Sequence, residues 1–219
     1  MAKGTGVQAM GSKGVLSQAG APSFSCLVVG VGGQGVVLAS RLIADACMAR
    51  GEFVRTAETI GMAQRGGSVA SHVRVAGCAA ELPSSLIPAR GAELVLAFEP
   101  GEAVRAADFL APGGSVVCAT SPVVPSAAAT SGYDGRAQLA WLAGQLPPAR
   151  FAQVDPAILA SRGLSPKCLN VLLLGAAVGL GALPFGADAL ADALRRRLKP
   201  ALVEMNLRAL GLGQSLALS

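Results

Sequence analysis

The sequence predicts an α/β domain with a Rossmann-like, open, mostly parallel, doubly wound sheet and a C-terminal helical layer. Three observations predict this fold. Short apolar runs alternate with helical patterns, a glycine-rich turn joins the first run to the first helix, and the chain from residue 167 onward reads as helices. Alanine and glycine are abundant while only 4% of residues are aromatic, which favours close packing of helices on a sheet over a β-sandwich.

The chain is predicted to contain one domain preceded by a tail. Residues 1–22 are rich in Gly, Ser, Gln and Ala without hydrophobic periodicity, which predicts a flexible N-terminal tail. This stretch has no continuous apolar run of the kind a secretory signal carries. Residues 23–219 are expected to form a single domain whose C-terminal helices start at about residue 156. With 52% hydrophobic residues, this length can bury a sizeable core.

The first part of the domain is predicted to alternate strands with helices. Strands are expected where apolar or alternating runs end at turn residues, over 24–29, 53–58, 68–75, 94–98 and 115–120. A helical pattern over 35–50 follows the first strand and opens a βαβ unit. A second helix is expected from Glu99 to Leu110, with a turn at Pro112-Gly113-Gly114 after it.

The second part of the domain is predicted to be mostly helical. A Pro/Ala/Ser/Gly-rich stretch over 121–150 contains an expected amphipathic helix around 136–146, in which Trp141 forms a satellite core with the nearby prolines. A short strand is expected over 150–155, with Asp155 as the N-cap of the following helix. Further helices are expected over 167–182, 186–198 and 200–211. The apolar run 171–185 is too short to span a membrane, so we expect a buried helix there.

Charge and cysteine content exclude two classes of function. The net charge of +5 arises from the tail and from residues 190–210, and no basic face is interleaved with aromatic residues, so nucleic-acid binding is not expected. The basic run Arg195–Lys199 is expected to be a solvated helix end, with a phosphate site as the alternative. Five widely separated cysteines without a C-x-x-C pair oppose a disulfide framework and a zinc or iron–sulfur site, so no metal site is predicted. Buried free thiols fit a cytoplasmic location.

The glycine-rich turn is the first candidate site. Gly30-Val31-Gly32-Gly33-Gln34-Gly35 satisfies G-x-G-x-x-G between a strand and a helix, where the helix N-terminus offers N–H groups to a phosphate. Glu58 follows at about the spacing of the ribose-binding acid of dinucleotide-binding domains. Alternatively, the glycines only let the helix and the strand pack closely. The amide of Gln34 is expected to reach a ligand or a partner chain.

A second glycine-rich loop follows the 53–58 strand. Because the carboxyl ends of parallel strands face the ligand crevice, both loops are expected on one rim of the sheet. Gln64 and Arg65 supply directional donors, and Arg65 can pair bidentately with a carboxylate or a phosphate. Alternatively, a Glu58–Arg65 ion pair only stiffens the loop. The candidate ligand or interface residues of this loop are Glu58, Gly61, Met62, Gln64, Arg65, Gly66, Gly67 and Ser68.

Two further polar residues are weaker candidates. His72 is the only histidine and lies in the 68–75 strand, opposite the valine face. We expect a half-exposed strand residue or an interface contact there, with catalysis as the alternative. Asn170 starts an apolar helix, where it is either a satisfied amide or a ligand. No complete catalytic set is found, so no catalytic residue is assigned.

Residues 30–75 resemble the gamma-type domain of 2-oxoacid:ferredoxin oxidoreductases, in particular the small (beta) subunits of the indolepyruvate ferredoxin oxidoreductases. The G-x-G-G-Q-G turn, the Arg-Leu-Ile helix and the acid followed by G-M-x-Q-R-G-G-S-V carry the likeness. SPKCLNVLLLGAA (165–177) and VEMNLRA (203–209) extend it, so that it covers about residues 24–211.

The resemblance implies oxidative decarboxylation of a 2-oxoacid, with an arylpyruvate such as indolepyruvate as the expected substrate. Thiamine diphosphate and iron–sulfur clusters are expected in a large partner subunit, coenzyme A as co-substrate, and ferredoxin as an acceptor reached through the complex. This chain is then a required subunit without cofactors of its own, inactive alone, that serves assembly and the gating of coenzyme A or substrate. The alternatives are a free-standing Rossmann-type dehydrogenase and a pure scaffold subunit.

Overall fold

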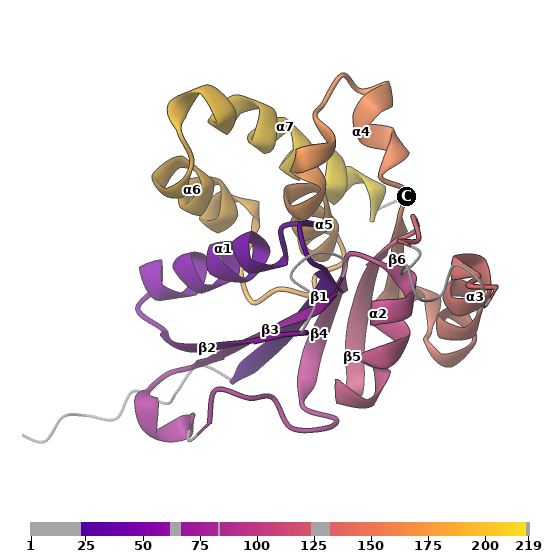
Figure 1. Cartoon of the computed structure of the whole chain (residues 1–219). Coiled ribbons are helices and arrows are strands. Elements are labelled where there is room, and N and C mark those ends of the chain that lie inside the picture. Colours follow the sequence, from indigo (N-terminus) through magenta and orange to yellow (C-terminus); the bar gives the residue numbers. More distant parts are fainter. Residues whose placement is uncertain (1–22, 62–66, 83, 124–131, 218–219) are drawn as a thin grey trace, which may run out of the picture.

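A computed structural model describes residues 23–61, 67–82, 84–123 and 132–217. A six-stranded sheet runs through the middle of the molecule in the order β2-β3-β1-β4-β5-β6 (Figure 1). The strands are β1 (Phe24–Val31), β2 (Phe53–Ile60), β3 (Ser68–Ala76), β4 (Ala92–Ala97), β5 (Leu110–Ala119) and β6 (Phe151–Val154). The α/β fold class predicted from the alternating pattern is confirmed.

The sheet is mostly parallel, with one strand reversed. β1, β4, β5 and β6 pair in parallel, whereas β3 is antiparallel to both β1 and β2. The expected βαβ unit is therefore wrong in one respect, because β3 separates β1 from β2. The short connection between β2 and β3 explains this arrangement, since a hairpin joins only antiparallel strands and a parallel crossover needs a dozen or more residues. β2 still points in the same direction as β1.

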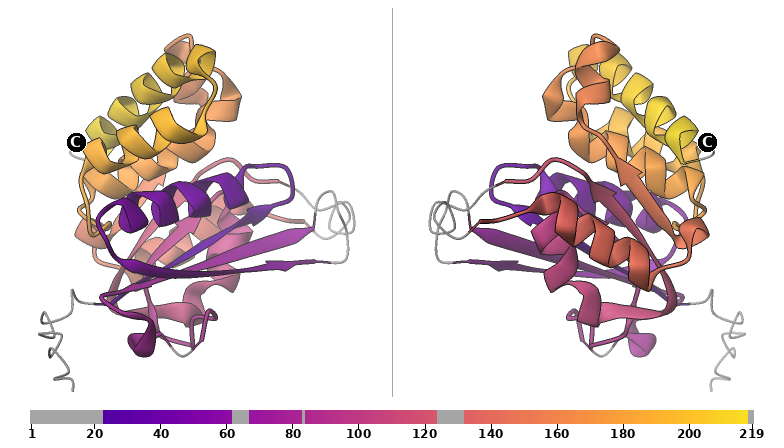
Figure 2. Two further views of the ribbon diagram at one scale, coloured as in Figure 1. Left: turned by 90° about the vertical axis from the view of Figure 1, so that its left-hand side faces the viewer. Right: turned by 90° about the vertical axis from the view of Figure 1, so that its right-hand side faces the viewer.

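Helices cover both faces of the sheet, as the doubly wound prediction requires (Figures 1 and 2). One face carries α1 (Val36–Ala49), α5 (Leu169–Gly179), α6 (Ala187–Arg197) and α7 (Pro200–Leu216). The other face carries α2 (Pro100–Arg105) and α3 (Gly135–Gln145), while α4 (Ala157–Ser161) connects β6 to α5. The larger core packs under α1, α5 and α6 and includes the buried Leu42, Leu96 and Leu172. A smaller core packs under α2 and α3.

Several element boundaries differ from the prediction. The helix expected to reach Leu110 ends at Arg105, and a 3-10 turn over Ala107–Phe109 leads into β5. The expected turn at Pro112–Gly114 lies inside β5, where a register shift against β4 and a φ of +80° at Gly113 mark a β-bulge. α7 continues to Leu216, five residues beyond its expected end.

In the helical part, one prediction of burial is wrong. Trp141 on α3 is 47% exposed, so the expected satellite core around it is wrong. By contrast, residues 171–177 of α5 are fully buried, as the apolar run predicted. The N-cap of α4 is Pro156, one residue after the expected Asp155, although Asp155 Oδ1 still accepts a hydrogen bond of 2.9 Å from Ala157 N at the helix start. Among the described residues, no helix is long and apolar enough to cross a membrane.

Candidate functional site

The candidate site lies at the rim of the sheet where the carboxyl ends of β1 and β4 meet. From β1 the chain passes to α1 on one face of the sheet, and from β4 it passes to α2 on the opposite face (Figure 1). Adjacent strands whose connections leave on opposite faces open a crevice between them, and open α/β sheets bind their ligands at such points. The glycine-rich turn borders this crevice.

The glycines of the turn have different roles. A Cβ atom at Gly30 would lie 2.8 Å from Phe98 Cβ, so close packing at that position requires glycine. Gly33 and Gly35 instead have φ angles of +98° and +93°, which side chains with a Cβ rarely adopt. Gly35 is the N-cap of α1 and supplies no side-chain capping bond, so the first N–H groups of this helix keep their capacity to bind an acceptor.

The side chain of Gln34 does not point outward. The expectation that its amide reaches a ligand or a partner chain is therefore wrong. Its Oε1 accepts a hydrogen bond of 2.7 Å from Val31 N, and its Nε2 donates one of 3.2 Å to Phe98 O. The side chain therefore ties the end of β1 to the residue that follows β4. The motif spacing gave no sign of this, because the side chain folds back to bond Phe98, which lies 64 residues further along the chain.

The second glycine-rich loop contacts the first. Gly61 N donates to Ser68 O at 2.9 Å and closes the β2–β3 hairpin, while Gly32 N donates to Gly67 O at 2.9 Å. The two loops thus lie on one rim, as expected from their places at the carboxyl ends of β1 and β2. Met62, Gln64, Arg65 and Gly66 lie outside the described residues, so their roles and the Glu58–Arg65 pair stay predictions.

Glu58 is not placed like a ribose-binding acid. It is exposed on β2, and β3 separates that strand from β1 and its glycine turn. In a dinucleotide-binding domain, the second strand lies directly beside the first. The inserted antiparallel strand therefore moves this acid away from the position that the G-x-G-x-x-G spacing predicted.

Asn170 lies against the start of α1. The residue is only 4% exposed, its Oδ1 accepts a hydrogen bond of 2.9 Å from Val171 N, and a Cβ at Gly35 would lie 3.1 Å from its Nδ2. Within the described part of the chain, the side chain of Asn170 makes no hydrogen bond other than this one, so Nδ2 has no partner. An accessible amide donor of a largely buried residue therefore stands beside an uncapped helix N-terminus, and together they form a place suited to an anion.

A buried acidic pair on the same rim was missed by the sequence reading. Glu99 and Glu102 are 2% and 5% exposed, and Glu102 N donates to Glu99 Oε2 at 3.0 Å. Tyr133 donates its hydroxyl to Glu99 and accepts from Gly101 N at 2.9 Å, and burial raises the pKa of this phenol. The Glu-x-x-Glu spacing after a buried strand was read only as a helix start.

The acidic pair connects α2 with the second loop. Glu102 accepts a hydrogen bond of 2.6 Å from Ser68 Oγ and forms an ion pair with Arg105. Together with the Gln34–Phe98 and Gly32–Gly67 hydrogen bonds, this contact joins the ends of β1 and β4 and the β2–β3 hairpin into one bonded unit. We call this unit the rim surface. It consists of Gly30–Gly35, Gly61, Gly67, Ser68, Phe98–Glu102, Tyr133 and Asn170.

His72 is part of the smaller-core side of the sheet, and the expected half-exposed position is wrong. It is 5% exposed, its Nδ1 accepts a hydrogen bond of 3.2 Å from Ile87 N, and its ring meets Phe109 edge to face with a centroid distance of 6.0 Å. Burial lowers the pKa of His72 below its ordinary value. The segment over 84–87 covers this face of β3, and the strand pattern carried no sign of it.

The stability of the chain is expected to fall as the pH drops from about 7 to about 5.5, because of His72. A histidine whose pKa is lowered on folding stabilises the protein above its unfolded pKa of about 6.5. Below that pH the unfolded chain binds the additional proton, with a limiting slope of about 1.4 kcal/mol per pH unit.

Urea denaturation at each pH measures this dependence. The matched variant His72→Asn, which keeps an acceptor for Ile87 N, should flatten the slope in this range, where no other histidine titrates. An equal slope in both proteins would assign the dependence to other groups.

The cysteines are all free thiols and stand in separate elements, although Cys26 of β1 and Cys47 of α1 lie close enough to influence each other. Cys26, Cys47, Cys118 and Cys168 are buried and Cys78 is exposed. Burial raises the pKa of the Cys47 thiol to about 12, so the thiol stays protonated at neutral pH. No group of three or more His, Cys, Asp or Glu side chains within the described ranges has an arrangement that could hold a metal ion.

Comparison with known sequences identifies relatives along almost the whole chain. Residues 25–216 match the family described as pyruvate ferredoxin/flavodoxin oxidoreductase. The indolepyruvate oxidoreductase subunit IorB of Archaeoglobus fulgidus is 38% identical over 198 residues, which is 90% of this chain and 96% of the relative. The protein of the same name from Methanothermobacter thermautotrophicus is 35% identical over 193 residues, which is 85% of this chain and 94% of the relative.

Solved structures share the fold at lower identity. The gamma subunit of a keto/oxoacid ferredoxin oxidoreductase from Geobacter sulfurreducens has a TM-score of 0.61 at 22% identity, over 89% of this chain and 98% of that chain. The 2-oxoglutarate:ferredoxin oxidoreductase from Magnetococcus marinus, solved with 2-oxoglutarate, coenzyme A and succinyl-CoA bound, has a TM-score of 0.63 at 20% identity. The match covers 89% of this chain but 31% of that longer chain.

Proposed function

Because this chain belongs to the pyruvate ferredoxin/flavodoxin oxidoreductase family, we propose that it is the small subunit of an indolepyruvate ferredoxin oxidoreductase. The observation that carries the proposal is the match to relatives named indolepyruvate oxidoreductase subunit IorB over 90% of the chain. The complex oxidises a 2-oxoacid with coenzyme A to an acyl-CoA and carbon dioxide, and passes two electrons to ferredoxin.

The division of labour follows from the side chains of this subunit. The buried cysteines stand in separate elements, and the described residues hold no ligand set for a cluster. In this proposal the large subunit holds the iron–sulfur clusters and the thiamine diphosphate. Thiamine supplies the carbanion chemistry of decarboxylation there, and the choice of oxoacid is made beside it. The small subunit is required for assembly of the complex, which acts in the cytoplasm. It contacts ferredoxin only as part of that complex.

The rim surface is the part of this chain that we propose to face the large subunit and coenzyme A. Its backbone and side-chain hydrogen bonds hold the ends of β1 and β4 and the β2–β3 hairpin in a fixed arrangement. The uncapped start of α1 and the free Nδ2 of Asn170 fit a phosphate group, of which coenzyme A carries several. In this arrangement the small subunit binds and orients coenzyme A for the acyl group formed in its partner.

Two alternatives fit the site less well. A free-standing dehydrogenase needs a ribose-binding acid near the glycine turn and an acid–base residue in a cleft. Glu58 lies on the far side of β3, and the single histidine is buried against Phe109. A pure scaffold subunit would leave the donors beside Gly35 without a ligand, although the largely buried Asn170 places its amide donor there.

Purification from the native cell tests the proposal. An affinity-tagged chain is expected to bring down a large subunit in stoichiometric amount, with the visible absorption of iron–sulfur clusters and with bound thiamine diphosphate. A chain that purifies alone and binds a nicotinamide nucleotide tightly would instead favour the dehydrogenase.

A further inference from the structure

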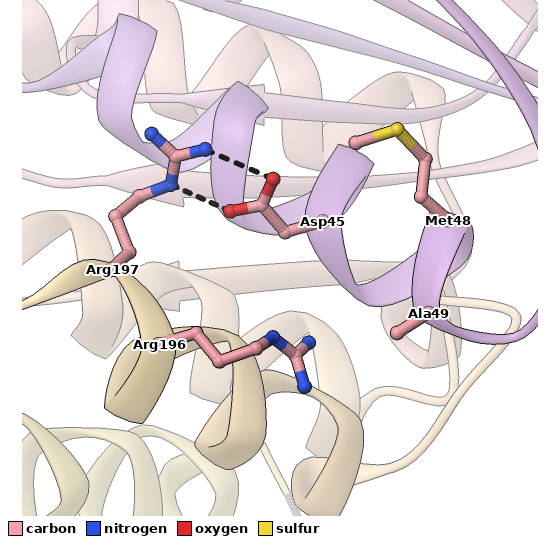
Figure 3. Close-up of a pocket in the computed structure, with 5 residues that line it drawn as sticks. All are labelled: Asp45, Met48, Ala49, Arg196 and Arg197. Atoms are coloured by element: carbon pink, nitrogen blue, oxygen red, sulfur yellow. Dashed lines mark hydrogen bonds and ion pairs between the residues drawn. The ribbon is translucent and has the colours of Figure 1, made fainter.

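A basic groove lies between the C-terminal ends of α1 and α6, at the end of α1 that is remote from the rim surface (Figure 3). It has a volume of about 630 Å³ and is lined by Asp45, Met48, Ala49, Arg196 and Arg197. From the sequence, a solvated helix end is favoured for this basic run over a phosphate site. The charged residues of the run are exposed, and two of them, Arg196 and Arg197, form one wall of a concave surface.

One arginine of the groove is fixed and another is free. Arg197 donates from Nε and from its terminal nitrogen to the two carboxylate oxygens of Asp45, at 2.6 and 2.9 Å, and so fixes α6 against α1. Arg196 extends its guanidinium towards the end of α1 (Figure 3) and makes no hydrogen bond or ion pair within the described residues. The groove therefore presents an unpaired cation on a rigid wall.

A second groove of about 340 Å³ adjoins the first and reaches the edge of the sheet. Its lining comprises Arg41, Ala44, Asp45, Met48, Val54, Thr56 and Arg197. Arg41 is exposed and, like Arg196, makes no ion pair within the described part of the chain. The linings of the two grooves together contain three arginines and one carboxylate, that of Asp45. The combined surface therefore carries two excess positive charges. Met48 is 52% exposed and offers an adaptable apolar contact.

The second groove runs along an edge strand of the sheet. β2 is the last strand of the sheet, and among the described residues only one of its two edges is paired, with β3. An exposed edge presents free N–H and C=O groups and can accept another strand. Val54 and Thr56 of β2 point into the groove, so alternate side chains of an added strand would lie over the same groove.

We propose that β2 and the two grooves receive an extended, acidic segment of another polypeptide, which adds a seventh strand to the sheet. Its backbone would pair with the free edge of β2, and its alternate carboxylates would meet Arg41 and Arg196. The proposal rests on the proposed function for the identity of the partner, which is the large subunit. A second copy of this chain is a poorer occupant, because antiparallel pairing of two β2 strands brings two basic grooves together on one face.

The charge-reversal variant Arg41→Glu/Arg196→Glu tests this inference in the complex with the large subunit. We expect at low ionic strength an affinity at least ~10-fold weaker than that of the wild-type chain, because close charge pairs across an interface are lost. The loss should shrink as salt is added. The variant Arg41→Lys/Arg196→Lys should keep most of the affinity. Arg136→Glu/Arg162→Glu is the control, since it makes the same charge change beside α3 and α4 and should bind normally.

Hydrogen exchange supplies the second readout. Amides on the free edge of β2, within residues 53–60, should become protected when the large subunit binds. A complex that forms with unchanged exchange in β2, or with equal affinity for the Glu variant and its control, would overturn this inference and leave the proposed function standing. No complex with the wild-type chain would overturn the proposed function itself. Protection of β2 in a self-associated chain without the large subunit would assign the edge to a second copy.

Discussion

Gly213→Ala is expected to lower the free energy of unfolding by about 3 kcal/mol, the upper range for overpacking in a close-packed interior. Among the described helices, α5 and α7 pack most closely against each other, and glycines lie where their two backbones meet. A Cβ at Gly213 would lie well inside van der Waals contact with Leu172 O, and a Cβ at Gly175 would do the same with Leu210 O. Neither carbonyl can move without separating α5 from α7. The added methyl group therefore weakens the packing along the whole contact between these two helices.

Gly211→Ala is the matched control for this prediction. Gly211 lies in the same helix, two residues before Gly213, and a Cβ there would have no neighbour within 4 Å. Alanine is the better helix former by about 1 kcal/mol, so this variant should be slightly more stable than the wild-type chain. Urea denaturation measures both. Equal stability of the two variants would show that the helices do not approach as closely as the structure has them.

Asn170→Asp is expected to raise the KM for coenzyme A at least ~10-fold in the complex with the large subunit, equivalent to about 1.4 kcal/mol. The change keeps the oxygen that accepts from Val171 N, but replaces the free amide donor beside Gly35 by a negative charge. A phosphate at the start of α1 would then be repelled. The same carboxylate suits the helix N-termini around it, so the stability of the lone chain should change by less than about 1 kcal/mol.

Gln145→Glu provides the matched charge change, because Gln145 is exposed at the end of α3. It should leave the KM for coenzyme A unchanged. If Asn170→Asp lost stability instead, while the KM stayed at the wild-type value, the amide would be a packing residue and the anion site would have to be abandoned.

The strands and most of the helices were predictable because each leaves a local pattern in the sequence. The apolar runs around Leu96 and Val117 can only be central strands in a fold of this class, and the helix after the first glycine turn follows from its periodicity. Strand order left no such pattern. Whether β2 lies beside β1 depends on where the β3 hairpin packs, and that is decided by tertiary contacts.

The candidate site was predictable at the level of its loops and not at the level of its side chains. Both glycine-rich loops were expected on one rim, since each follows the carboxyl end of a strand. The amide of Gln34, however, is hydrogen-bonded between the ends of two strands. Glu99 accepts a hydrogen bond from Tyr133, which lies 34 residues further along the chain. Such contacts depend on pairs of residues distant in sequence, and no spacing rule in one chain reports them.

The activity of separated and recombined subunits tests the central claim most directly. The rate of ferredoxin reduction with indolepyruvate and coenzyme A should be measured for this chain alone, for the large subunit alone, and for their mixture. We expect the lone chain to be inactive and to carry no chromophore, and the mixture to reduce ferredoxin. A lone chain that reduced ferredoxin, or a dye, with an arylpyruvate at the rate of the mixture would contradict the account.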